Sequence, residues 1–525
     1  MAFKFQINQG LQFNHDQKLL HKADENLPET KINVVKGKRL VELVKDPEKL
    51  EQVGIKNVGT MEDLAQLKMT RGSKIIIDFG RHVVGKFNVQ IEHAGSPMDA
   101  PLAFRIRFAE MPNELAHQSS EYDGWLSKSW IQEETIHLDQ LPADLHLPRR
   151  YSFRYVEISV IDTSPKWFAL FSNPEVTAQS TVEQPVKDAP QTGDSELDQI
   201  YQVGVATLHE CMQDVFEDGP KRDRRLWLGD LRLQALANYA SFDDVQLVKR
   251  CLYLFGAMTT ADGVISANVF TNQQYVPDDT FMYDYSLFFI STLDDLEQHH
   301  PDEEILQDLY PIAKKQWQST EQYIDDQGKV RTNDDYPVFV DWSNEFDKTT
   351  CAQAITIYAL RQLIDLGKRI GDDSAVSDYE TLLTKLVAYA KTLFDADQGF
   401  FVSGDHQEVN VASQVWMVLA KVLDDDQNQQ LMKRVVNQLF PIQGIATPYM
   451  YHHVTQALFE AGLKDDAVQL IKDYWGKMVQ LGADTYWEAF EPDKPDYSPY
   501  GSPIVNSYCH AWSCTPVYLL QKYCR

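Results

Sequence analysis

The chain has 525 residues, which is long for one domain and comfortable for two or three. Hydrophobic residues make up 43% and charged residues 24%, proportions typical of a globular protein, so neither a disordered chain nor a fibre is indicated. The formal net charge of -28 would repel a phosphate backbone and an anionic membrane surface. Nucleic acid and membranes are therefore disfavoured as partners, and a neutral substrate is favoured.

The N-terminus and the cysteines indicate the compartment. The residues MAFKFQINQGLQFNHDQ contain no apolar core and no small-residue cleavage site, so we expect no secretory signal. The six cysteines are scattered and have no CxxC spacing: Cys211, Cys251, Cys351, Cys509, Cys514 and Cys524. This pattern favours reduced thiols over a disulfide framework or a zinc site, and we predict a cytoplasmic protein.

The first part of the chain has the periodicity of strands. Apolar and polar residues alternate with a period near two in five segments separated by turn residues: 74–80, 83–94, 102–110, 130–138 and 152–161. This spacing is typical of a sandwich of two sheets. We predict an N-terminal antiparallel β-sandwich over residues 1–180. A polar, proline-containing segment, residues 182–196, is the expected boundary.

The pattern then becomes helical, with amphipathic stripes that are clearest in residues 354–370 and 379–394. The predicted helices begin near Leu197, Leu231, Asp244, Tyr283, Glu303, Thr349, Ser377, Val409, Asn428, Met450, Asp465 and Ile504. About twelve helices suit six hairpins in a ring, and no fixed-period repeat supports a solenoid. We predict an (α/α)6 barrel over residues 190–525, in which loops at one end converge on a pocket.

The segment EDGPKRDRRLWLGDLR, residues 217–232, combines acids, bases and a tryptophan. If a helix starts directly after the Gly-Pro turn, Asp223, Trp227 and Asp230 share one face of it. Two carboxylates beside an aromatic ring suit the floor of a sugar pocket. A charged loop held by Arg–Asp ion pairs is the alternative, and the charges alone favour that alternative.

Two C-terminal segments also place polar groups among aromatics. DTYWEAF puts Glu488 next to Trp487, and an acid in such surroundings must be paired, titrate at a raised pH, or take part in chemistry. A pairing with a nearby Arg or Lys is an equally good explanation. SYCHAWSC puts His510 and Trp512 near the start of the last helix, where a lone histidine is more often a core residue.

Two weaker segments contain further acids. YVPDDTFMYDYSLFF puts Asp279 and Asp284 at a helix start, where acids also serve as caps. VFVDWSNEF puts Asp341 beside Trp342 in a loop before another helix. Nucleotide-binding, HEXXH and GxSxG motifs are absent, so we predict no cofactor and no metal, although bound Ca²⁺ stays open. Acids dominate, and glycoside cleavage uses a pair of acids.

Together these segments resemble the bacterial α-L-rhamnosidases that have a six-hairpin (α/α) barrel. IIIDFGRHVVGKFNVQI and YSFRYVEI resemble strands of the β-sandwich of that family, and DGPKRDRRLWLGD resembles its acid-rich catalytic loop. ATPYM, DTYWEAF and SYCHAWSCTPVYLL resemble its later elements, and all six occur in the order of the family. The resemblance covers most of the chain. It implies an inverting glycoside hydrolase that cleaves terminal α-L-rhamnose.

The resemblance also implies roles for residues. Asp223 takes the position of the general acid and Glu488 that of the general base. The family loop usually carries Glu at the acid position and is one residue longer, so this match requires a gap; another anchoring would place Arg224 there, which cannot donate a proton at neutral pH. The sugar-binding and pocket-wall positions are then Asp218, Arg222, Trp227, Asp230, Asp279, Asp284, Asp341, Trp342 and His510. Trp487 is a further candidate for the apolar wall that faces the methyl group of rhamnose.

A general acid must hold a proton, and the three arginines at positions 222, 224 and 225 oppose this unless they point away from Asp223. The alternatives to a rhamnosidase are an unsaturated uronyl hydrolase or another enzyme on the same barrel, a non-catalytic sugar-binding protein, and a helical scaffold. An uronate would require basic residues, for which Arg222 is the obvious candidate. Many members of the family that the chain resembles carry an extra β domain after the barrel. Because the given sequence stops at Arg525, we expect a compact member that acts on short rhamnosides. The sequence leaves the oligomeric state open and allows a homodimer.

Overall fold

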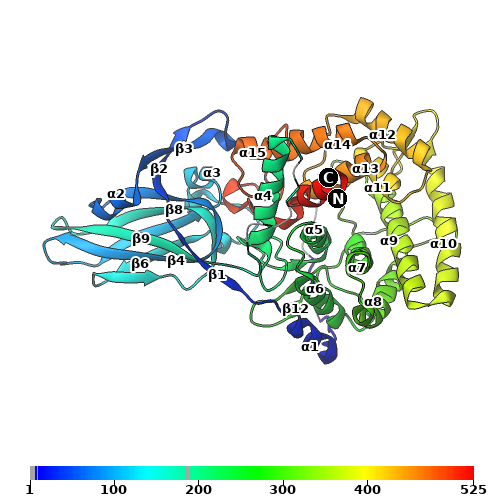
Figure 1. Ribbon diagram of the computed structural model, residues 1–525, viewed down its shortest axis with the longest axis horizontal. Helices are drawn as coiled ribbons and strands as arrows, with labels where there is room; N and C mark the ends of the chain where they lie inside the picture. Colours follow the sequence, from blue (N-terminus) through cyan, green and yellow to red (C-terminus); the bar gives the residue numbers. More distant parts are fainter. Residues whose placement is uncertain (1–5, 9, 184–185, 187–188, 191, 525) are drawn as a thin grey trace.

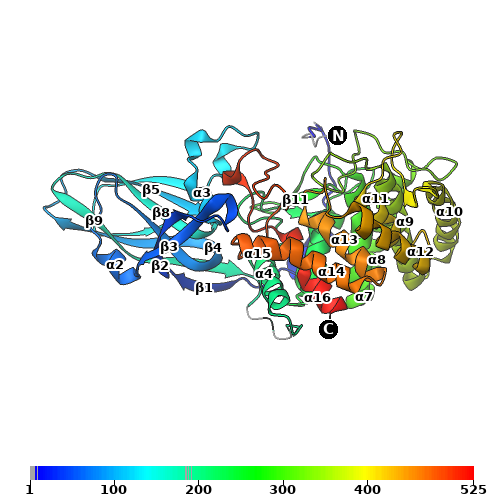
Figure 2. The same cartoon turned by 90° about the horizontal axis from the view of Figure 1, so that it is seen from above.

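The computed structural model describes residues 6–8, 10–183, 186, 189–190 and 192–524. A β domain and a helical domain lie side by side along the longest axis of the molecule (Figures 1 and 2). The strands end at Ser180 and the helices of the second domain begin at Ser195. The expected boundary segment, 182–196, lies in part outside the described residues, as do residues 1–5 of the expected N-terminus.

The described part of the β domain contains one nine-stranded sheet whose neighbouring strands pair antiparallel. Its main path runs β1-β9-β4-β8-β5-β6, with β2, β3 and β7 attached to β4 or to one another. The strands are β1 (Lys31–Lys36), β2 (Arg39–Lys45), β3 (Val53–Gly59), β4 (Lys74–Gly95), β5 (Leu102–Ala109), β6 (Glu133–Leu138), β7 (Ala143–His146), β8 (Tyr151–Asp162) and β9 (Trp167–Ser180).

Strand β4 joins the two predicted segments 74–80 and 83–94 into one bent strand. Its pairing with β8 shifts register between Asp78 and Val83, and its second half pairs with β7 and β9 instead of β2. Gly85 lies in this second half, and a Cβ atom there would stand 2.3 Å from the Thr177 carbonyl oxygen of β9. Only glycine therefore fits where β4 crosses this strand.

The N-terminal residues belong in space to the helical domain. Helix α1 (Gln17–Glu25) packs against α6 (Val245–Ala257) at the bottom of the helical domain in Figure 1. The Asn14 backbone N–H donates to the Thr259 carbonyl oxygen at 2.8 Å, and the Arg250 guanidinium donates to the Ala23 carbonyl oxygen at 2.8 Å. The residues that precede the β domain in the sequence therefore pack against the helical domain.

The helical domain is a double ring. Six inner helices contact one another in a closed circle: α5 (Leu228–Tyr239), α7 (Tyr283–His299), α9 (Thr349–Ile370), α11 (Val411–Leu419), α13 (Pro448–Glu460) and α16 (Pro516–Tyr523). The outer helices are α4 (Ser195–Cys211), α6, α8 (Glu303–Glu321), α10 (Asp373–Thr392), α12 (Asp425–Leu439) and the continuous stretch α14 (Lys464–Ile471) to α15 (Lys477–Leu481). The predicted order, an antiparallel β domain and then six helical hairpins, is confirmed.

Local chemistry sets the helix ends that the periodicity located. The Asp302 carboxylate accepts hydrogen bonds from two backbone N–H groups at the start of α8, and the Thr447 hydroxyl caps α13, whose first residue is Pro448. Helix α9 ends at Gly371 in the left-handed region, with φ 79°. Such caps explain why most predicted starts lie within a few residues of the observed ones.

The predicted start of the last helix, near Ile504, is wrong. Residues Pro503–Val505 form a single 3₁₀ turn, and α16 begins twelve positions later at Pro516. The intervening backbone makes long-range contacts instead: the His510 N–H donates to the Tyr486 carbonyl oxygen at 2.8 Å. These contacts hold residues 506–510 as a loop at the end of the ring, and a 3₁₀ turn at Ala511–Ser513 follows it.

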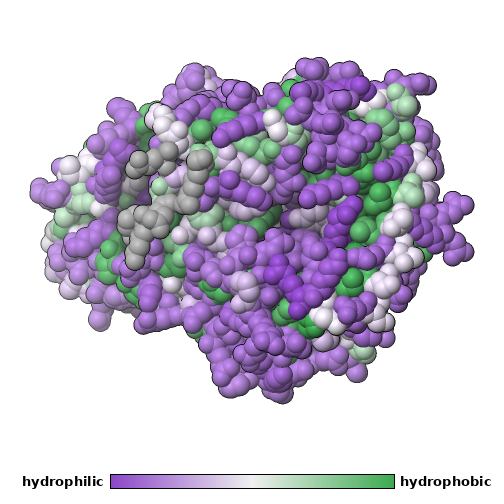
Figure 3. All heavy atoms as spheres, turned by 45° about the vertical axis from the view of Figure 1, so that its right-hand side comes forward, coloured by the Kyte–Doolittle hydropathy of each residue, from purple (hydrophilic) through white to green (hydrophobic). Residues whose placement is uncertain are grey.

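The drawn surface is mostly hydrophilic (Figure 3). On the face drawn in Figure 3, hydrophilic residues cover most of the outline and hydrophobic residues show mainly in the hollows. In the part of the chain that the structure describes, none of the helices has the length and apolar character that crossing a membrane requires.

Candidate active site

A cavity of about 320 Å³ opens where the inner helices begin. The first turns of α5 and α7 and the loops before α9 and α16 contribute to it. Nine of the predicted site residues line the cavity: Asp218, Arg222, Asp223, Trp227, Asp230, Asp279, Trp342, Glu488 and His510. Carboxylates that are far apart in the sequence therefore meet at one place.

The acid-rich loop between α4 and α5 is not helical at its centre. Asp223 and Trp227 both precede α5, so the predicted shared helix face is wrong, although both residues line the cavity. Trp227 is held by a short pairing of β10 (Leu226–Trp227) with β11 (Asn268–Phe270). The loop, and not the helix period, brings the two side chains together.

Asp223 and Arg224 have positive φ values of 62° and 52°. Two successive non-glycine residues in the left-handed region are strained, at a cost on the order of 1–3 kcal/mol each. The loop is held from both sides: the Arg225 N–H donates to the Asp218 carboxylate at 3.0 Å, and the Ala511 N–H donates to the Asp218 carbonyl oxygen at 2.8 Å. Such fixed strain is typical of catalytic loops, where it aims a side chain into a site.

Arg222 connects the two proposed catalytic acids. One nitrogen of its guanidinium pairs with Oε2 of Glu488, and the other stands 3.7 Å from Oδ1 of Asp223. Its Nε donates to the Val505 carbonyl oxygen at 2.8 Å, and the cation lies 4.1 Å from the centre of the Tyr500 ring. With 2% of its surface exposed, Arg222 is a fixed group in the floor of the cavity.

Glu488 is held as firmly as Arg222. The Tyr500 hydroxyl donates to its Oε1, and the Trp512 indole N–H donates to its carbonyl oxygen at 2.9 Å. The Glu488 N–H donates to the Ser507 carbonyl oxygen at 3.0 Å. The pairing of Glu488 with an arginine was one of the sequence alternatives, and here this paired carboxylate faces the cavity.

Three further polar side chains share the floor. Burial raises the pKa of Asp218 well above its ordinary range, and the charges of Asp223 and Asp230 act in the same direction. Burial also raises the pKa of Asp230, although His510, whose Nε2 lies 3.1 Å from Oδ1 of Asp230, opposes this shift. Carboxyl groups of this kind can both donate to and accept from the hydroxyls of a bound sugar.

The side chains of the three arginines in this loop, at positions 222, 224 and 225, point in different directions. Arg224 donates to the Arg150 carbonyl oxygen at 3.0 Å and does not line the cavity. Arg225 lines it, but its guanidinium lies over the Phe270 ring at 4.3 Å. Arg222 is therefore the arginine that faces Asp223 at close range, and it is shared with Glu488.

Three predicted site residues do not line the cavity. The Asp284 carboxylate accepts from the Phe339 and Val340 N–H groups at 3.1 and 3.0 Å. The Asp341 carboxylate accepts from the Ala446 and Thr447 N–H groups at 3.0 and 3.1 Å. Both acids hold the cavity loops together and do not face the substrate space.

Trp487 is also turned into the protein. Its ring packs 5.5 Å from the rings of Phe490 and Tyr508, and 1% of its surface is exposed. Several aromatic residues that line the cavity were not predicted from the sequence, among them Trp125, Trp130, Phe270 and Tyr500. Two of them, Trp125 and Trp130, come from the β domain, and the only sequence signal for them is a pair of tryptophans in an otherwise polar segment.

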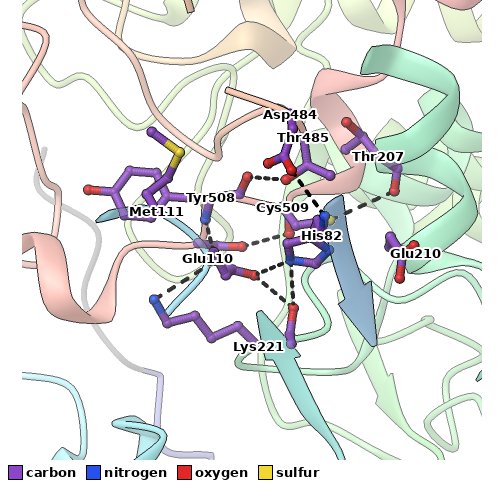
Figure 4. Close-up of polar contacts among 12 residues, drawn as sticks. His82, Glu110, Met111, Thr207, Glu210, Lys221, Asp484, Thr485, Tyr508 and Cys509 are labelled. Atoms are coloured by element: carbon purple, nitrogen blue, oxygen red, sulfur yellow. Dashed lines mark hydrogen bonds and ion pairs between the residues drawn. The ribbon is translucent and has the colours of Figure 1, made fainter. Parts of the chain in front are cut away.

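A buried polar network joins the β domain to the loops of the site (Figure 4). Glu110 accepts from the Tyr508 N–H at 2.7 Å and from the Ser152 hydroxyl at 2.8 Å, and it lies 3.1 Å from Nε2 of His82. Lys221 lies 3.8 Å from the same carboxylate. Since Lys221 precedes Arg222 and Tyr508 is two residues before His510, the β domain holds two segments that line the cavity.

The pKa of His82 is raised in this network. Burial alone would lower its pKa, but Cys509 and Glu110 outweigh burial and raise the pKa of His82 to about 10. Its backbone N–H donates to the Asp484 carboxylate at 3.0 Å. The DFGRH, DTYWEAF and SYCHAW segments of the sequence therefore meet at this interface.

A larger cavity, of about 1090 Å³, lies at the other end of the ring, where α5 and α7 end. It is lined by several acids and bases, among them Asp294, Asp295 and Arg232. It contains none of the paired acids of the smaller cavity. Among the described residues, no group of three or more His, Cys, Asp or Glu side chains is arranged to hold a metal ion.

The double ring of helices and the acidic, aromatic cavity at one end of it define a glycoside hydrolase of the six-hairpin class. Residues 37–178 match the model of the glycosyl hydrolase family 78 α-rhamnosidase N-terminal domain, and residues 190–524 match that of the bacterial α-L-rhamnosidase six-hairpin glycosidase domain. The chain therefore belongs to the α-L-rhamnosidases of glycosyl hydrolase family 78. This confirms the resemblance and the predicted class of enzyme.

Solved structures agree with this assignment. A rhamnosidase from Klebsiella oxytoca with rhamnose bound is 42% identical, covers 98% of this chain and 100% of its own, and superposes with a TM-score of 0.94. The family 78 rhamnosidase of Bacillus sp. GL1 is 20% identical over 90% of this chain and 49% of its own, with a TM-score of 0.72, which shows the shared fold. No curated protein sequence matches the chain with statistical significance.

Proposed function

We propose that this α-L-rhamnosidase removes terminal α-L-rhamnose from short rhamnosides with inversion, with Asp223 as the general acid and Glu488 as the general base. The observation that carries the proposal is the shared guanidinium of Arg222, which lies beside both carboxylates in one cavity. Glycoside cleavage requires two carboxyl groups on either side of the bond that breaks.

The position of the guanidinium favours inversion. Because Arg222 bridges Asp223 and Glu488, the two carboxyl groups are kept apart by the width of a planar cation. Inverting enzymes separate their acids by about 6.5–9.5 Å to admit a water molecule, and retaining enzymes by about 5–5.5 Å. In the proposed step Asp223 protonates the glycosidic oxygen as the bond to the anomeric carbon breaks. Glu488 takes the proton of the water that attacks the opposite face.

The rest of the floor suits a 6-deoxy sugar. Asp218, Asp230 and His510 are placed to hydrogen-bond the hydroxyls, and Trp227 and Trp342 offer apolar surface to the methyl group. The Klebsiella oxytoca rhamnosidase has rhamnose bound. The small sugar substrate follows from the family. The cytoplasmic location, the homodimer and the domain limits of 1–180 and 190–525 remain predictions.

The test is release of nitrophenol from p-nitrophenyl α-L-rhamnopyranoside, beside the α-L-fucoside, β-D-glucoside and an unsaturated uronide. We expect turnover of the rhamnoside at least about a hundredfold above the others, because a pocket built to hydrogen-bond one hydroxyl pattern rejects another. Proton NMR of the first product should show β-L-rhamnose. The α anomer as first product would exclude inversion, and preference for the uronide would exclude the sugar assignment.

A further inference from the structure

Burial divides the cavity into a charged floor and an apolar rim. The floor consists of side chains that are at most 4% exposed: Asp218, Arg222, Asp230, Glu488 and His510. Some apolar lining residues are half-buried or exposed and form the rim, among them Trp125, Leu126, Trp130, Phe270 and Trp342. A substrate whose sugar fills the floor must place its aglycone against this rim.

Trp125 is the most exposed member of the rim, with 47% of its surface accessible. Among the described residues it is the only aromatic in the set of exposed large hydrophobics, which otherwise holds Ile, Leu and Val. A tryptophan exposed at the mouth of a cavity offers a flat apolar face at a place where a ligand passes.

The loop that carries Trp125 is held against the helical domain. The Trp125 indole N–H donates to the Pro499 carbonyl oxygen at 3.2 Å, and its ring lies 5.4 Å from that of Tyr500. A Cβ atom on Gly124 would stand 2.6 Å from the Tyr500 carbonyl oxygen, so glycine permits this close approach. Since the Tyr500 hydroxyl contacts Glu488, the loop position is tied to the catalytic floor.

The polar groups at the rim already have partners. Asp279 accepts from the Asn8 N–H at 2.8 Å, and Asp278 accepts from the Asn268 side-chain amide at 2.8 Å. The Arg225 cation is stacked on Phe270. A second sugar needs several hydrogen bonds to its hydroxyls, whereas a flat aromatic group needs apolar faces, and the rim offers mostly the latter.

Resting on the proposed function, we propose that Trp125 is the platform of an aglycone subsite that binds flat aromatic aglycones. The β domain then supplies substrate selection and the helical domain supplies the chemistry. Loss of this stacking surface is expected to weaken binding of an aromatic aglycone about tenfold, which corresponds to about 1.4 kcal/mol.

The experiment compares the wild type with Trp125→Ala and Trp125→Phe on three substrates: 4-methylumbelliferyl α-L-rhamnopyranoside, methyl α-L-rhamnopyranoside and a rhamnosyl-glucose disaccharide. For Trp125→Ala we expect KM to rise about tenfold on the aromatic substrate, with less than about a twofold change in kcat. We expect methyl rhamnoside, the disaccharide and the inhibition constant of free rhamnose to change by less than about twofold. Trp125→Phe should restore most of the lost affinity, because it keeps a flat ring.

Ile161→Ala is the matched control, since Ile161 is 48% exposed on β8 and does not line the cavity. An equal rise in KM on the disaccharide would show that the rim binds a sugar and would overturn the aromatic assignment. An unchanged KM on the aromatic substrate, or an equal rise on methyl rhamnoside, would overturn the subsite. If the wild type hydrolysed none of the rhamnosides, the proposed function itself would fall, a result distinct from the other two.

Discussion

The Tyr508 backbone N–H donates a 2.7 Å hydrogen bond to Oε2 of Glu110, which is 398 positions away in the sequence. This bond, within the network of Figure 4, ties the β domain to the loop that carries His510. The β domain is therefore part of the catalytic unit, because it fixes loops that line the cavity.

Replacing Glu110 by glutamine should destabilise the protein and weaken catalysis. The substitution removes the carboxylate that lies 3.1 Å from buried His82, whereas Lys221 keeps its closer partner Glu114. Breaking a buried ion pair from one side costs about 3–5 kcal/mol. We expect a lower thermal unfolding midpoint and a lower kcat. The matched control is Glu25→Gln, whose side chain is 60% exposed. Equal midpoints for the two variants would contradict a positioning role for Glu110.

The two proposed catalytic acids, Asp223 and Glu488, should respond differently to the leaving group. Asp223→Asn should lower kcat by about 10²–10⁴ on methyl α-L-rhamnoside, because alkoxide departure needs a proton, but much less on the nitrophenyl substrate, whose leaving group is stable as an anion. Glu488→Gln should lower kcat on both substrates alike, because water must be activated in each case. Steady-state kinetics on the two substrates measures this. Equal losses for Asp223→Asn on both would show that it is not the general acid.

Tyr500→Phe removes the hydroxyl that donates to Oε1 of Glu488 and keeps the ring under Arg222. A hydrogen bond to a charged group is worth about 1.5–3 kcal/mol, so we expect kcat/KM to fall by about tenfold or more. Tyr389→Phe on α10, outside the cavity, serves as the control. Activity equal to that of the control would mean that Tyr500 does not hold the base.

Asp294→Asn should stabilise the protein in a pH-dependent way. Burial, with Asp295 and Asp365, raises the pKa of Asp294 to about 7 from an ordinary value of 3.8, and its Oδ1 has no hydrogen-bond partner. A raised acid pKa means that folding favours the protonated form, so stability falls as pH rises from the unfolded pKa to the folded one. The variant should gain on the order of 2 kcal/mol at about pH 8 and nearly nothing at about pH 4. Unfolding midpoints at both pH values measure this, and an equal gain at both would assign the effect to hydrogen bonding.

Much of the secondary structure and several site residues could be predicted from local sequence patterns. Alternation in residues 102–110 and stripes in residues 354–370 reflect burial of one face of a strand or helix, which is a property of neighbouring residues. The acids of the loop at 217–232 and Glu488 could be selected because carboxylates among aromatics are rare and chemically meaningful. The prediction that Asp223, Trp227 and Asp230 share one helix face is wrong, because Asp223 has a strained, left-handed backbone where a helix was expected.

The sequence by itself determined the order of the two domains, the class of the helical ring and the acids from which the site is built. These features could be predicted because periodicity and unusual combinations of residues are properties of short segments. Only the tertiary structure decided which of those groups face the cavity. Asp284, Asp341 and Trp487 turn inward to hold loops, and Trp125 reaches the rim from the other domain. No local pattern couples residue 125 to residue 500, because contacts between distant segments depend on packing that the whole chain must form first.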